Sequence, residues 1–196
     1  AVIFMVDSGG VRLHEANAGL IAISEIMRAV LDTRAAGVPV LALVGGSCGA
    51  FGGMGIVSRL CSAIVMSEEG RLALSGPEVI ETVAGVEEFD SKDRALVWRV
   101  TGGKHRLLTG DCDVLVEDDI AAFRAAAIAC MNDTHEGPPT LAALRAWHAA
   151  LAARAHDFAQ ERDGLDVWRA LGVPDAENVP MLTATEVTAL AARRHG

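Results

Sequence analysis

The sequence predicts an α/β fold built on parallel strands, and two observations lead to that class. Two uncharged apolar runs of strand length, residues 2–6 and 40–44, are typical of strands covered on both faces of a parallel sheet. Between them, residues 13–31 place apolar side chains at three- and four-residue intervals, which indicates one face of a helix. Strand, helix and strand in this order make the crossover unit of a parallel sheet.

A glycine-rich turn follows each of these two strands and leads into a helical pattern. Gly9-Gly10 comes after the first strand, and residues 45–53 come after the second. Because glycine has no Cβ, its main-chain N–H can approach a ligand closely, and the next helix adds unpaired N–H groups and its positive end. The two turns therefore predict a site that stabilises a developing negative charge, such as an enolate oxygen. The alternative is that these glycines only make tight turns.

The rest of the chain adds short strands and several helices. Strands are expected at 63–66, 71–74 and 112–116, and helices from Pro77 and over 119–131. The charged, glycine-broken stretch 87–104 is interpreted as a surface helix and loop. Gly137-Pro138-Pro139 predicts a boundary, so we expect a domain over 1–136 and a helical C-terminal extension over 137–196 that contacts other subunits. An amphipathic helix over 140–162 is expected to open that extension.

Composition excludes several classes of partner. The 196 residues carry a formal net charge of -9 with an isoelectric point near 5.1, which argues against binding to nucleic acid or to an anionic membrane. The uncharged window 38–57 contains six glycines, so a membrane-spanning helix is not expected there. We predict a cytoplasmic protein with neither nucleic acid nor membrane as partner. Because the sequence opens with Ala1 inside a strand pattern, an upstream segment is expected to be missing.

Metal and cofactor motifs are absent from the sequence. The four cysteines, Cys48, Cys61, Cys112 and Cys130, show no CxxC spacing and are predicted to be reduced thiols in the core. His14-Glu15 does not extend to HExxH, and neither a complete dinucleotide fingerprint nor a GxxxxGK[ST] loop is present. We therefore predict no metal site and no directly bound cofactor.

Another interpretation of the second turn is a nucleophile elbow. Residues 45–49 match G-x-S-x-G between a strand and a helix. Ser47 would then be an acyl-transfer nucleophile, with His135 or His148 as base and Asp113 as its orienting carboxylate.

Three segments carry a resemblance to a known family. They are Asp7-Ser8-Gly9-Gly10-Val11-Arg12-Leu13-His14-Glu15, the turn from Gly46 to Gly53, and Ser75-Gly76-Pro77-Glu78-Val79-Ile80-Glu81. In order and spacing they resemble the acyl-thioester half of biotin-dependent carboxyltransferases. Residues 9–19 and 87–93 are similar, more narrowly, to the β subunit of biotin-independent malonate decarboxylases. The likeness covers about Val2 to Met131.

This resemblance implies a crotonase-like (ClpP-like) ββα spiral that pairs with a homologous γ subunit. The pair would decarboxylate a malonyl thioester on an acyl carrier protein subunit, giving the acetyl thioester and CO2. Acyl-pantetheine, the prosthetic group of the carrier protein or part of coenzyme A, would be the substrate carrier. Matching positions make the N–H groups of Gly9, Gly10, Gly49 and Ala50 the candidate catalytic donors. Val11, Arg12 and His14 are the matching candidates for binding the acyl-pantetheine substrate.

Two other functions fit the same sequence. A carboxyltransferase component that passes the carboxyl group to or from biotin would use the same motifs. A noncatalytic scaffold subunit would use the glycine turns only for packing. The candidate binding residues near the first turn also have simpler interpretations. His14 could be a solvated histidine at the start of a helix. Arg12 could form a surface ion pair with a nearby carboxylate.

Overall fold

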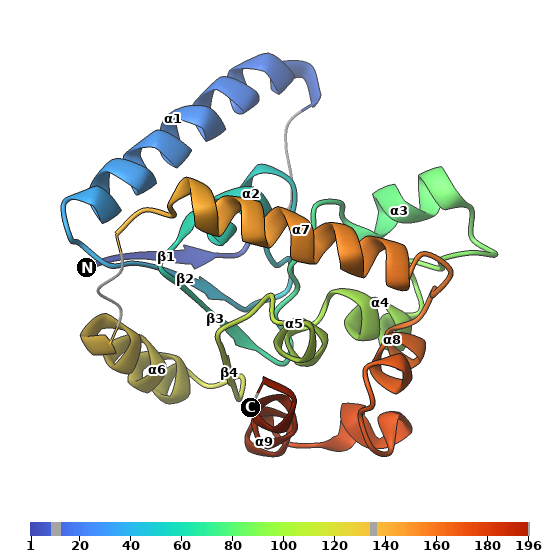
Figure 1. Ribbon diagram of the computed structural model, residues 1–196. Coiled ribbons are helices and arrows are strands. Elements are labelled where there is room, and N and C mark those ends of the chain that lie inside the picture. The colour runs from blue at the N-terminus through green and yellow to red at the C-terminus, as the bar shows by residue number, and fades with distance from the viewer. Residues whose placement is uncertain (9–12, 134–136, 196) are drawn as a thin grey trace.

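The computed structural model describes residues 1–8, 13–133 and 137–195, and within them it contains a four-stranded parallel sheet (Figure 1). The strands are β1 (Val2–Val6), β2 (Val40–Val44), β3 (Ala63–Ser67) and β4 (Val114–Val116). They lie side by side in chain order, and every neighbouring pair is parallel. The segments after β1, β2 and β3 therefore leave the sheet at the same edge.

The helices connect these strands and make up the C-terminal part of the chain. Their bounds are α1 (Ala16–Ala35), α2 (Gly53–Leu60), α3 (Pro77–Ala84), α4 (Arg94–Thr101), α5 (Gly103–Thr109), α6 (Ile120–Asp133), α7 (Leu141–Asp157), α8 (Gly164–Ala170) and α9 (Ala184–His195), with 3-10 turns η1 (Leu13–Glu15) and η2 (Ala176–Met181). Local chemistry sets several of these ends. Pro77 opens α3, and the Asp93 and Thr140 side chains cap α4 and α7.

Helices cover both faces of the central strands. Alternate residues of β2 point to opposite faces, so Ala42 and Val44 pack in one core cluster with α1 and α2 residues, while Leu41 packs in another with residues of α6. Figure 1 shows α1 and α6 on opposite sides of the sheet. This layering explains why residues 40–44 are apolar without alternation, as predicted.

The first strand is less buried than its sequence predicts. β1 pairs with β2 alone among the described strands, so it lies at the edge of the sheet. Val2 and Ile3 are exposed, and Met5 is 86% exposed. The prediction of a fully buried strand over 2–6 is therefore wrong for the described chain, because one side of this strand lacks a neighbour there.

The C-terminal helices share a core with the sheet region. Leu108 of α5 and Leu115 of β4 pack in one cluster with Trp168, Val179 and Val187. Figure 1 shows α9 close to β4 and α5. The division at 136/137 stays a prediction, but the residues beyond it are not packed as a separate unit.

Two predicted elements differ from the structure. Residues 71–74 form only isolated bridges, Ala50 with Leu72 and Arg71 with Gly102, because this segment runs between the second glycine turn and the α4–α5 junction. The stretch 87–104, expected at the surface, contains buried Val97 and Thr101 on α4. The helix predicted over 140–162 ends at Asp157.

Two predictions about composition can be compared with the described residues. All four cysteines are free thiols, and three of them are buried, whereas Cys48 is half-buried. Across 1–8, 13–133 and 137–195, none of the helices combines the length and the apolar character needed to cross a bilayer.

Candidate functional site

The second glycine turn holds a carboxylate on its main chain. The N–H groups of Cys48 and Gly49 donate to Oδ1 of Asp7 at 2.7 and 3.0 Å. These bonds, with that of Gly49 the stronger influence, hold the pKa of the Asp7 carboxyl below its ordinary value. A Cβ on Gly46, whose φ is +74°, would lie 2.6 Å from Asp7 Oδ2. The turn therefore binds a carboxylate of the protein itself through two main-chain N–H groups, and its role toward a substrate stays a prediction.

The same contacts place Asp7 and Ser8, the last described residues before the first glycine turn, next to the second turn. Ser8 N–H donates to the Gly49 carbonyl oxygen at 2.7 Å. The end of β1 and the residues that follow it therefore lie beside the turn that follows β2. Strand pairing explains this, because β1 and β2 are parallel neighbours and both turns follow their carboxyl ends.

The candidate residues of the first turn fall mostly outside the described part of the chain. Gly9, Gly10, Val11 and Arg12 belong to the range 9–12, which the structure does not describe. His14 lies in η1, just before α1, and its side chain is exposed. The roles assigned to these residues stay predictions.

The candidate donors of the second turn already have acceptors within the protein. Gly49 N–H is bonded to Asp7, and Ala50 N–H donates to the Arg71 carbonyl oxygen at 2.7 Å. Ala50 is fully buried. Binding of an oxyanion by either group would require Asp7 or the Arg71 carbonyl to be displaced, so their catalytic role stays a prediction.

The further donors expected from the helix after the second turn begin a few residues downstream, at residues that the sequence did not single out. Gly52 caps α2 with φ +58°, and its own N–H donates to the Leu74 carbonyl oxygen. The N–H groups of Gly53, Met54 and Gly55 follow in the first turn of α2, where a helix provides no acceptor of its own. The glycines also allow close packing, since a Cβ on Gly53 would lie 2.5 Å from Ile23 Cγ1. The sequence feature that marks these donors is the Gly52-Gly53 pair at the end of the turn.

The nucleophile-elbow interpretation is not supported by the described residues. Ser47 follows β2, at the carboxyl edge of the sheet, whereas Asp113 directly precedes β4 and accepts a hydrogen bond from Ile64 N–H near the amino edge. His148 is exposed on α7, and His135 lies outside the described residues. Ser47 and Asp113 are therefore placed at opposite edges of the sheet.

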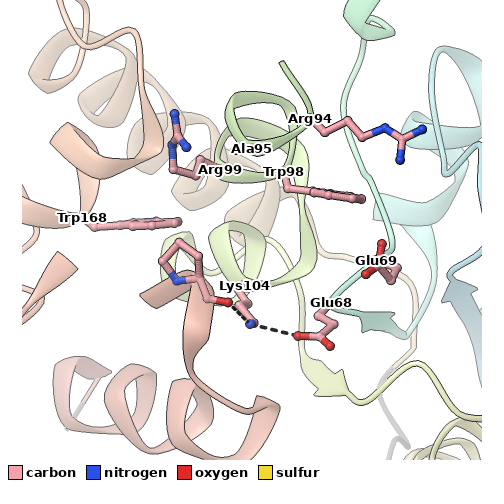
Figure 2. A pocket seen from close by; sticks show the side chains of 9 residues that line it. Glu68, Glu69, Arg94, Ala95, Trp98, Arg99, Lys104 and Trp168 are labelled. Atoms are coloured by element: carbon pink, nitrogen blue, oxygen red, sulfur yellow. Dashed lines mark hydrogen bonds and ion pairs between the residues drawn. The ribbon is translucent and has the colours of Figure 1, made fainter. Parts of the chain in front are cut away.

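Two pockets adjoin the segments that follow β2 and β3. The larger, of about 500 Å³, opens between α4, α5 and the C-terminal segment (Figure 2). Lys104 bonds there to Glu68 at 2.9 Å and to the Pro180 carbonyl oxygen at 2.8 Å. Buried Trp168 also lines it, and its indole N–H has no hydrogen-bond partner among the described residues.

The smaller pocket, of about 350 Å³, runs along the side of α2 just after its first turn. Ile56, Leu72 and Leu74 form an apolar wall. Arg59, Arg106 and Asp111 supply its charged groups.

His, Cys, Asp and Glu side chains are spread over residues 1–8, 13–133 and 137–195. This part of the chain contains no group of three or more His, Cys, Asp or Glu side chains arranged to hold a metal ion.

The sequence matches the carboxyl transferase domain family over residues 1–158. Among curated proteins, it is 40% identical over 197 residues to the malonyl-S-ACP:biotin-protein carboxyltransferase MADC of Malonomonas rubra, covering 98% of this chain and 62% of that one. It is 31% identical over 119 residues to a biotin-dependent acetyl-/propionyl-coenzyme A carboxylase beta6 subunit of Mycobacterium bovis, covering 59% of this chain and 23% of the relative.

Solved structures of malonate decarboxylase and transcarboxylase are also similar to this chain. A Pseudomonas malonate decarboxylase hetero-tetramer in complex with malonate contains a chain that matches with a TM-score of 0.71 and 37% identity, over 91% of this chain and 59% of that one. The transcarboxylase 12S structure matches with a TM-score of 0.53 and 25% identity, over 65% of this chain and 23% of the other. The chain thus spans about three fifths of the length of the first of these relatives.

These likenesses confirm the predicted fold class, an α/β crotonase-like fold with helices in its C-terminal part. They also confirm the resemblance to malonate decarboxylases and carboxyltransferases. Since the family match covers well over half of the sequence and includes both glycine turns, the chain belongs to the carboxyl transferase domain family.

Proposed function

We propose that this chain is the β-type subunit of a malonate decarboxylase, which converts a malonyl thioester on an acyl carrier protein to the acetyl thioester and CO2. The observation that carries the proposal is the main-chain anion site: the turn after β2 binds a carboxylate through N–H groups, and α2 begins directly beyond it. The likeness over 91% of the chain to a Pseudomonas malonate decarboxylase supports the choice of substrate.

The reaction needs what such a site supplies. When the C–C bond to the carboxylate breaks, CO2 leaves and the electron pair remains as an enolate whose charge rests on the thioester oxygen. A proton then adds to the carbon to give the acetyl group. Fixed N–H donors stabilise the enolate, and each contributes about 3 kcal/mol because it is oriented before charge develops. No covalent nucleophile is required.

The donors are assigned from both turns. Gly9 and Gly10 remain the proposed donors of the first turn. In the second turn the first-turn N–H groups of α2, beginning at Gly53, are better placed than Ala50, whose N–H is bonded to Arg71. In the proposal, Gly49 maintains the turn through Asp7, and Val11, Arg12 and His14 line the approach of acyl-pantetheine.

The proposed partners are a homologous γ subunit and an acyl carrier protein subunit. The Pseudomonas relatives were solved as a hetero-tetramer and as an MdcD-MdcE hetero-dimer, which supports a heteromeric assembly. The acidic net charge of -9 is in keeping with protein partners rather than nucleic acid.

A second candidate is transfer of the carboxyl group to biotin. The 40% identical relative from Malonomonas rubra is a malonyl-S-ACP:biotin-protein carboxyltransferase, which favours this alternative. The same enolate would form at the same N–H donors, and the two functions differ only in the fate of the carboxyl group.

Release of labelled CO2 tests the proposal. The parent protein is mixed with its γ partner, malonyl thioester on carrier protein, and no biotin. Release that needs both subunits is the expected result. Carboxyl transfer that appears only when a biotin protein is added would instead assign the second candidate. Absence of both reactions would leave the scaffold alternative.

A substitution in α2 tests the donor assignment. Gly52→Ala causes no clash, because no atom lies within 4 Å of the added Cβ. It does strain the backbone, because φ at this position is +58° and an alanine rarely adopts that value. This strain should disturb the orientation of the first-turn N–H groups of α2. We expect activity to fall by about tenfold or more. The control is Gly19→Ala in α1, where the added Cβ also meets no atom within 4 Å. Equal activity in the two variants would contradict the assignment.

A further inference from the structure

Two arginines and one carboxylate line the smaller pocket, and a third arginine, outside the lining, pairs with that carboxylate. Arg106 and Arg154 bond to Oδ2 of Asp111 at 3.2 and 2.9 Å, and Arg59 donates to the Asp111 carbonyl oxygen at 3.2 Å. Burial raises the pKa of the Asp111 carboxyl, but the arginines, led by Arg106, outweigh it and lower that pKa. Two guanidinium groups therefore bind one carboxylate, and a third binds the main-chain carbonyl oxygen of the same residue.

One of these arginines is incompletely satisfied. The Nε–H of Arg106 is buried and has no hydrogen-bond partner among the described residues. The charged groups that act on Arg106 are Asp111, Arg154 and Arg59, so two of the three are also cations. A guanidinium presents several donors in a planar fork that matches a carboxylate. The pocket can therefore bind a second anion.

The walls of the pocket limit that anion to one with a short apolar stem. Leu72 is buried, and Ile56 and Leu74 extend the wall toward solvent. Ile56 follows the three first-turn residues of α2 directly, so the wall leads from the helix end to the arginines. A volume of about 350 Å³ suits a small acyl group.

We propose that this pocket takes the free carboxylate of a malonyl-type acyl thioester, with Arg59 and Arg106 binding the carboxylate and Leu72 and Leu74 covering the methylene. The identity of the acyl group rests on the proposed function. The two arginines are then specificity-determining residues, because an acetyl group cannot make this contact. After CO2 leaves, the acetyl product loses the arginine contact and dissociates more readily.

The larger pocket does not offer the same contact. Its Lys104 is paired with Glu68, and its Arg99 forms a bidentate pair with Asp163 at 2.6 to 3.0 Å. Arg94 also lines that pocket, together with one further carboxylate, Glu69. An added carboxylate would meet no excess of cations there.

Equilibrium binding tests the inference without turnover. The probes are the amide analogues of malonyl- and acetyl-pantetheine, in which N–H replaces the thioester sulfur, and titration calorimetry gives Kd for each. We expect the malonyl analogue to bind about tenfold or more tightly than the acetyl analogue. Arg59→Gln should remove most of this preference, whereas Arg59→Lys should keep part of it because the charge remains.

Two further variants make the result decisive. Arg106→Gln should also reduce the preference, and half-buried Arg59 provides a separate test if Arg106→Gln does not fold. The control is Arg28→Gln on the exposed surface of α1, where the arginine pairs with Glu25 three residues away. This variant should keep the full preference.

Several outcomes would overturn the inference. They are equal affinity of the two analogues for the unmodified chain, a preference that survives Arg59→Gln, and binding of neither analogue. The result is also separable from the decarboxylase proposal. If the malonyl analogue binds more tightly, this preference needs the arginines, and no CO2 is released, the decarboxylase proposal is refuted and the pocket assignment is supported. If CO2 is released but the two analogues bind equally, the pocket assignment is refuted and the decarboxylase proposal is supported.

Discussion

The two pockets beside the sheet differ in how their charges are balanced. In the larger, Lys104 and Arg99 are each paired with a carboxylate of their own, Glu68 and Asp163. In the smaller, three arginines share Asp111. The larger pocket has more volume, but the smaller one has the unbalanced charge that an anionic acyl group needs. For this substrate class, charge balance is a better guide to the site than volume.

The pockets also differ in their relation to the main-chain donors. The smaller pocket includes Gly55 and Ile56, so it starts at the first turn of α2. The larger pocket begins at Glu68 and Glu69, after β3, and continues toward Trp168 of α8. The smaller pocket therefore combines donors for an enolate oxygen with cations for a carboxylate. The following predictions test this difference.

Removal of Asp111 should have the largest effect. Asp111→Ala leaves Arg106 and Arg154 partly buried without their common carboxylate, and loss of one partner from such a group typically costs about 3 to 5 kcal/mol. Urea denaturation measures the free energy of unfolding. The control, Asp157→Ala at the exposed end of α7, should change that free energy by no more than about 0.5 kcal/mol. Similar losses of unfolding free energy in the two variants would show that the Asp111 cluster does not stabilise the fold more than a surface carboxylate does.

Removal of Asp163, the equivalent carboxylate of the larger pocket, should cost less. Asp163 pairs with Arg99 and also caps α8 by accepting from Leu165 N–H at 3.0 Å. Asp163→Ala leaves a single arginine, which is near enough to solvent to be rehydrated, so we expect a loss of about 2 kcal/mol in the same urea assay. A loss larger than that of Asp111→Ala would contradict the comparison of the two pockets.

The Asp111 cluster should also make stability depend on pH. Because the arginines lower the folded-state pKa of Asp111 below the value of about 3.9 in the unfolded chain, its contribution is present above pH 4 and is lost as pH falls through the folded pKa. Asp111→Asn should be less stable than the unmodified chain at pH 7, and the gap should narrow below about pH 4. Thermal unfolding at a series of pH values measures the gap, and a constant gap would exclude this origin.

The smallest effect is expected in the aromatic wall of the larger pocket. Trp98→Ala removes an indole that lines the larger pocket (Figure 2) and is not among the residues that line the smaller one. The preference for the malonyl over the acetyl analogue should stay within about twofold of its original value. A much larger loss would assign the carboxylate to the larger pocket instead.

Much of the fold and part of the site follow from local features of the sequence. The apolar runs of β2 and β3 and the three- and four-residue spacing in α1 predict the strands and the helix correctly, because periodicity reflects which side chains face the core. Asp7 and Ser8, which precede the first glycine turn, lie against the second turn, since parallel neighbours end at the same edge. The family resemblance was visible because its motifs lie in those turns.

The partners of particular groups depended on tertiary structure. No pattern near Asp7 indicates that its carboxylate binds N–H groups of Cys48 and Gly49, and none near Ala50 indicates that its N–H is bonded to Arg71. The same is true of Arg154, which reaches Asp111 across 43 residues of sequence. By itself, the sequence determined the strands, the helices and the turns that can bind an anion, because these depend on short-range sterics and periodicity. Only the packed chain decided which donors are already bonded and where positive charge is in excess, because those contacts join segments far apart in the sequence.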